Sequence, residues 1–60
     1  MKIDAIYSTD EIVRLGLRKE HILRTKAKAF EKGDKVYFFE EVSPKHLRLY
    51  SIINKKSFFL

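Results

Sequence analysis

The apolar and polar positions near the N-terminus follow the pattern of a short, capped helix. Ser8 and Glu11 have the spacing of a capping box, in which the Ser8 hydroxyl accepts from the backbone N–H of Glu11 and the Glu11 side chain reaches back. Tyr7 and Ile12 stand at the two positions of a hydrophobic staple around this cap. Gly16 follows where a left-handed residue commonly ends a helix. The pattern therefore predicts a helix of about two turns, which needs tertiary support to persist.

A second helix is predicted to begin at Arg18 or Lys19. One of its faces would carry apolar side chains at helical spacing, namely Leu23, Ala27 and Phe30, with Ile22 at the margin. The opposite face would carry Arg18, His21, Arg24, Thr25 and Lys28. The sequence allows two positions for the C-terminal end of this helix. The helix runs to about Phe30, or it stops near Lys26 and a short strand follows.

A turn and a strand are expected next. Residues 32–35, with Gly33 and Asp34 at their centre, read as a tight turn. Residues 36–39 are a β-favouring run of one valine and three aromatic residues. If residues 28–31 are extended, the two flanks of the turn pair as a small hairpin.

The C-terminal third allows two interpretations. Ser43 and Pro44 suit the cap and first position of a third helix to about Asn54, along which Leu47, Tyr50 and Ile53 form an apolar stripe. The alternative pairs residues 36–42 with residues 47–53 as a hairpin around residues 43–46. We expect the helix. The apolar tail of Phe58, Phe59 and Leu60 is expected to fold back over the core, with an exposed contact patch as the alternative.

These elements predict a single domain over residues 1–60, mainly α with a small β-hairpin, in a winged helix-turn-helix arrangement of three short helices plus a wing. The chain has no cysteine, so neither a disulfide nor a thiolate metal site is expected, which fits an intracellular protein. No apolar run has the length of a membrane span and no signal sequence is evident, so a cytoplasmic location is expected.

The net charge of +5 is concentrated in the middle of the chain. Residues 14–35 contain eight lysines and arginines against three acidic residues, a net of +5, whereas residues 1–13 carry −2 and residues 36–60 carry +2. Such a patch attracts phosphate and speeds encounter with a polyanion. The plainer interpretation is a solvated, lysine-rich surface that keeps a small protein soluble.

Catalytic and metal sites are not expected. The two histidines, His21 and His46, are far apart in the sequence and have no cysteine to complete a zinc site. Glu40 and Glu41 are adjacent, so in a strand they would point to opposite faces and could not act as a paired acid and base. No phosphate-binding glycine loop is present, and 60 residues seldom enclose a substrate cavity. We therefore expect neither an enzyme nor a cofactor.

Four stretches together resemble the excisionase-like branch of the MerR-type winged-helix proteins. They are Tyr7 to Leu17 (YSTDEIVRLGL), Ile22 to Arg24 (ILR), Lys32 to Phe39 (KGDKVYFF) and Ser43 to Leu47 (SPKHL). The resemblance covers about residues 7–50. The chain departs from the family in having Arg18 and Lys19 where Ser or Thr usually opens the recognition helix, and in a shorter interval between Gly16 and Tyr37.

This resemblance implies double-stranded DNA binding, with the second helix in the major groove and a basic wing on the backbone. The residues that would contact DNA are Arg18, Lys19, His21, Arg24, Thr25, Lys28, Lys32, Gly33 and Lys35. The implied role is an excisionase, that is a recombination directionality factor, or a small phage or mobile-element regulator that also contacts neighbouring copies of itself or a recombinase. The alternative is a phage-encoded protein-interaction module or inhibitor of a host protein, which would use residues 36–39 or the tail.

Overall fold

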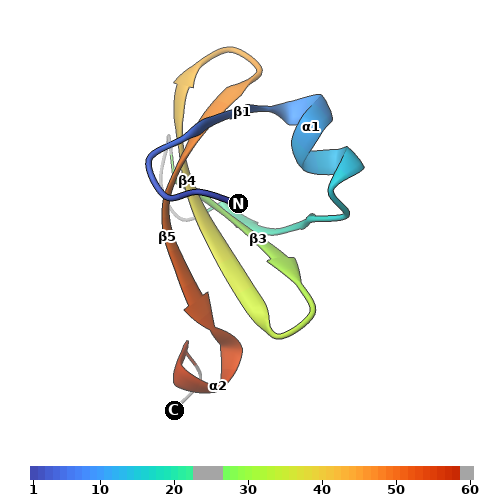
Figure 1. The fold of residues 1–60 in the computed structure, drawn as a ribbon, viewed down its shortest axis with the longest axis vertical. Coiled ribbons are helices and arrows are strands. Elements are labelled where there is room, and N and C mark those ends of the chain that lie inside the picture. Colours follow the sequence, from blue (N-terminus) through green and yellow to red (C-terminus); the bar gives the residue numbers. More distant parts are fainter. Residues whose placement is uncertain (23–26, 59–60) are drawn as a thin grey trace.

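A computed structural model describes residues 1–22 and 27–58 of the chain. In chain order its elements are β1 (Ile6–Ser8), α1 (Thr9–Arg14), β2 (Arg18–Ile22), β3 (Ala27–Lys32), β4 (Lys35–Ser43), β5 (His46–Asn54) and α2 (Lys55–Phe58). The five strands form one antiparallel sheet in the order β1-β5-β4-β3-β2 (Figure 1). The domain is therefore mainly β, and the expected winged helix-turn-helix is wrong.

The predicted third helix is strand β5. Its side chains alternate, with Leu47 and Leu49 buried and Tyr50 exposed, which is the period of two of a strand. Ser43 pairs with His46, so Pro44 and Lys45 form a two-residue loop and the alternative hairpin interpretation is confirmed. Lys45 has a φ of 67°, and a positive φ directly after a proline is typical of a type II turn. The Ser-Pro pair therefore opens a turn rather than a helix.

The predicted second helix is also absent, because its described residues lie in β2 and β3. The two-residue loop between Lys32 and Lys35 sets the register, so that Phe30 lies opposite Tyr37. Gly33 in this loop has a φ of 60°, a conformation that glycine adopts readily. The predicted turn is confirmed, and the hairpin around it is longer than expected because β3 begins at Ala27.

Helix α1 is confirmed, and the sequence specifies both of its ends. The Glu11 backbone N–H donates to Ser8 Oγ at 3.1 Å. At the other end Gly16 has a φ of 82°, its N–H donates to the Val13 carbonyl at 3.0 Å, and the Leu17 N–H donates to the Ile12 carbonyl at 3.3 Å. This pair of bonds is a Schellman motif, which satisfies two carbonyls that the end of the helix would leave unpaired.

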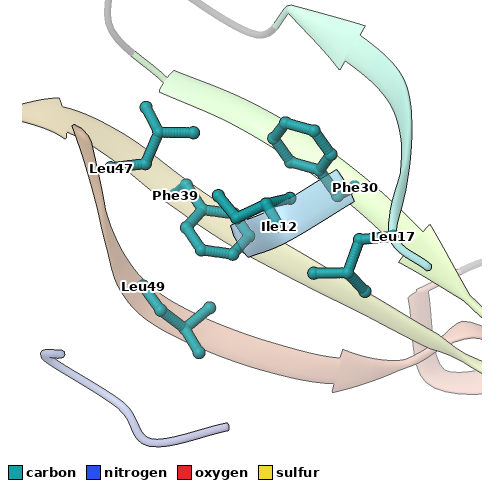
Figure 2. Packing of buried hydrophobic residues seen from close by; sticks show 6 residues of the cluster. All are labelled: Ile12, Leu17, Phe30, Phe39, Leu47 and Leu49. Atoms are coloured by element: carbon teal, nitrogen blue, oxygen red, sulfur yellow. The ribbon is translucent and has the colours of Figure 1, made fainter. Parts of the chain in front are cut away.

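The hydrophobic core lies between α1 and one face of the sheet, which we call the inner face. Its buried members are Ile12, Leu17, Phe30, Phe39, Leu47 and Leu49. Figure 2 shows Ile12 on the helix in front of the Phe39 ring, with the other four side chains around them. The Phe30 and Phe39 rings meet edge to face at 5.3 Å, a favourable arrangement for aromatic pairs. The Schellman motif contributes directly, since the two apolar residues that it joins, Ile12 and Leu17, both belong to this core.

Candidate nucleic-acid interface

The β3–β4 turn, the end of β5 and α2 come together at one end of the molecule, the lower end in Figure 1. Lys35 lies opposite both Lys32 and Asn54 in the sheet register. The Lys55 backbone N–H donates to the Asp34 carbonyl at 2.7 Å, so α2 begins beside the turn. Residues about twenty positions apart in the sequence therefore share one small surface.

This surface, which we call the basic end, has an excess of positive charge. Among the described side chains its cations are Arg18, Lys32, Lys35, Lys55 and Lys56, and its acids are Glu31 and Asp34. Five cations against two carboxylates leave a net charge of about +3, which attracts anions to this end.

Some of these cations are already engaged in holding the fold. Lys55 Nζ forms an ion pair with Glu31. Lys32 binds the carboxyl end of α1, where a cation also complements the helix dipole. Arg18, Lys35 and Lys56 are exposed and form no ion pair with any side chain that the structure describes. These three are the cations best placed to meet an external anion.

Five described carboxylates lie away from the basic end, namely Asp4, Asp10, Glu11, Glu40 and Glu41. Asp10 and Glu11 occupy the first turn of α1, whose Thr9 N–H donates to the Lys45 carbonyl at the β4–β5 turn. Arg48 lies between Asp4 and Glu40, with N–O distances of 2.6 Å and 3.1 Å. The same part of the described chain carries five cations, so its charges balance and the net positive charge of the described side chains lies at the basic end. An approaching polyanion would be oriented towards that end.

The residues predicted to contact DNA do not share a helix face. Arg18 and Lys35 lie exposed at the basic end, and Gly33 lies in the β3–β4 turn directly before Asp34 and Lys35. Lys32 is directed to the Leu15 carbonyl. Lys28 lies in β3 and forms an ion pair with Glu41 at 3.5 Å, away from the turn.

The remaining residues predicted to contact DNA lie in strand β2 or outside the described residues. Lys19 and His21 belong to the backbone of β2, opposite Phe30 and Ala29, while Arg24 and Thr25 lie outside the described residues. Of the tail, Phe59 and Leu60 are outside them too. The sequence argument missed Lys55 and Lys56 because only the pairing of β4 with β5 brings them to Lys35. Their basic character was visible in the sequence, but their position was not.

Comparison with known proteins adds no family: no protein-family description, curated protein or solved structure matches the chain. None of the helices in residues 1–22 and 27–58 is long and apolar enough to cross a membrane. Within the same residues no group of three or more His, Cys, Asp or Glu side chains could hold a metal ion.

Proposed function

We propose that this domain binds the phosphate backbone of double-stranded DNA through its basic end. The observation that carries the proposal is the sheet register, which places Lys35 beside Asn54 and the lysines that follow it. Exposed lysine and arginine side chains neutralise phosphates and release counterions, which drives association with DNA. Arg18 adds a planar guanidinium that can pair with a phosphate through two hydrogen bonds.

The mode of binding differs from the one expected from sequence. Helix α1 has six residues, an acidic first turn and a buried Ile12, so it is unsuited to lie in a major groove. Contacts to phosphates position a protein on DNA without reading the sequence of bases. We therefore propose binding of low sequence specificity, with the two-residue β3–β4 turn as the part that approaches the duplex.

The biological role is proposed on the same chemistry. A small DNA-binding regulator or recombination directionality factor of a phage or mobile element, acting in the cytoplasm of a bacterial or infected cell, fits a compact basic domain. Neighbouring copies on the same DNA, or a recombinase, would then be its partners. The alternative, a protein-interaction module that uses residues 36–39, is less favoured because Val36 and Phe39 are buried in the domain and offer no surface to a partner.

A salt titration tests the proposal. Binding to a duplex of random sequence is measured by fluorescence anisotropy for the parent chain and for the triple variant Arg18→Gln, Lys35→Gln and Lys56→Gln. Log K falls as log salt rises, and each lost phosphate contact should make this negative slope shallower by about 0.9. The slope of the triple variant should therefore be shallower than the parent's by roughly 2.7. Its affinity at low salt should fall on the order of tenfold or more.

Lys45→Gly is the matched control, because Lys45 is an exposed lysine in the hairpin turn at the opposite end. Lys45→Gly should make the salt slope shallower by much less than the triple variant does. If the triple variant binds duplex DNA with the parent's affinity and salt slope, the proposal is wrong. Binding of a protein partner that is insensitive to salt, with no duplex binding, would instead support the interaction module.

A further inference from the structure

The face of the sheet away from α1, the outer face, carries an exposed aromatic side chain next to an arginine. The Tyr50 side chain is on β5, and the residue is 38% exposed. Its ring lies 6.3 Å from the Phe38 ring at an interplanar angle of 36°. The Arg48 Cζ atom lies 5.9 Å from the centre of the Tyr50 ring, within the range of a cation–π contact.

The sheet register connects Tyr50 to the basic end. The register between β4 and β5 shifts after Phe38, where the partners change from Ser51 to Leu49 and Tyr50 is left as the additional residue. The contact between the rings places Tyr50 on the face of Phe38. Val36 is two positions from Phe38 on β4, so the Val36 side chain lies on the same face as Phe38. Val36 is paired with Glu31, and Glu31 is paired with Arg18. The side chains of Tyr50 and Arg18 therefore lie on the same side of the sheet.

We propose that Tyr50 stacks an unpaired base of single-stranded DNA whose phosphates continue to Arg18 at the basic end. This inference rests on the proposed function, which it extends from the phosphate backbone to the bases. Single strands are commonly bound by an aromatic side chain that stacks a base beside a positively charged surface that follows the backbone. The outer face presents the Tyr50 ring, and Arg18 at the basic end lies on the same side of the sheet. The stacking needs no particular base because every base has a π face.

The charges around Arg48 give the strand a direction. Asp4 and Glu40 both contact this arginine, so two carboxylates face one guanidinium. The excess negative charge disfavours phosphates on that side of Tyr50. From the stacked base the strand should therefore run across the sheet towards β2 and the basic end. Strands lie about 4.8 Å apart, so the three intervals from β5 to β2 span roughly 14 Å.

The test compares Tyr50→Leu with Tyr50→Phe on an oligothymidine of about 12 nucleotides, a length within the range of single-strand binding sites on small β domains. Tyr50→Leu keeps an apolar side chain and removes the ring, and should weaken single-strand binding about tenfold. Tyr50→Phe keeps the ring and should bind like the parent. Both variants should keep the parent's circular dichroism spectrum and duplex affinity.

An abasic oligonucleotide of the same length separates stacking from charge. The parent should bind it about tenfold more weakly than oligothymidine, whereas Tyr50→Leu should bind both equally. If Tyr50→Leu binds oligothymidine as the parent does, while the triple basic-end variant loses duplex and single-strand binding, the stacking proposal fails and the proposed function stands. If the triple variant loses neither, the proposed function fails as well. Self-association of the parent that Tyr50→Leu abolishes, with single-strand affinity unchanged, would assign the outer face to a second copy.

Discussion

Replacing Ile12 by alanine tests whether α1 is held to the sheet by the core. Ile12 is 1% exposed and lies among Leu17, Phe30 and the β4 and β5 side chains of the inner face. The change removes three buried carbon atoms and should leave a cavity beside the Phe39 ring, in front of which Ile12 lies in Figure 2. Buried isoleucine-to-alanine changes cost about 2–5 kcal/mol.

That cost is large for a domain of this size. At about 0.05–0.15 kcal/mol per residue, a 60-residue domain unfolds with roughly 3–9 kcal/mol. Ile12→Ala should therefore remove about a fifth or more of the stability, and a domain in the lower part of that stability range should be left unfolded. Ile12→Val, which removes one methyl group, should cost only about 0.5–1.5 kcal/mol.

Urea unfolding followed by circular dichroism measures the effect. With a slope near 1 kcal/mol/M for a small domain, a loss of about 2–3 kcal/mol would lower the midpoint by roughly 2–3 M. Val13→Ala is the matched control, because the next residue of the same helix is 70% exposed. It should change stability by less than about 0.5 kcal/mol. Equal losses for Ile12→Ala and Val13→Ala would refute the packing of α1 against the sheet.

Two further changes test backbone conformations. Gly16→Ala should cost about 1–2 kcal/mol in thermal or urea unfolding, because Gly16 has a φ of 82°, while the nearest atom to the added Cβ, on Lys32, is at an ordinary 3.8 Å. An unchanged midpoint would show that the Schellman geometry at Gly16 is not formed. Lys45→Gly should stabilise the domain by up to about 1 kcal/mol, because it relieves the positive φ in the β4–β5 turn. A clear loss of stability on that change would show that Lys45 does not adopt this conformation.

The sequence predicted the elements whose ends are fixed by local chemistry. Ser8, Glu11 and Gly16 act within a few residues of themselves, so α1 could be placed correctly from the chain alone. The same holds for the turn at Gly33. Nothing in these signals depends on residues that are distant in the sequence.

The sequence predicts a helix at β2 and allows β3 and β5 only as alternatives to helices. For β5 the reason is that its sequence satisfies two periods at once. Leu47, Tyr50 and Ile53 have helical spacing, while Leu47 and Leu49 alternate with polar or exposed positions as in a strand. Pairing of β5 with both β1 and β4 decides between them, and that pairing is a tertiary property. The candidate site follows the same rule: Arg18 and Lys35 were identified as basic residues, but their grouping with Lys56 depends on the register.

The pairing of β1 with β5 has a consequence for how the domain folds. Ile6 lies opposite Arg48, so the first strand cannot find its place until the last strand exists. The strand pairs from β2 to β5 join neighbours in the sequence, whereas joining β1 to β5 closes a loop of about forty residues and has a larger entropic cost. We expect the hairpins to form first and the N-terminal strand to dock late, which makes folding slower than in a helical domain of equal length. During synthesis the domain would therefore remain incomplete until nearly all of its residues have been made.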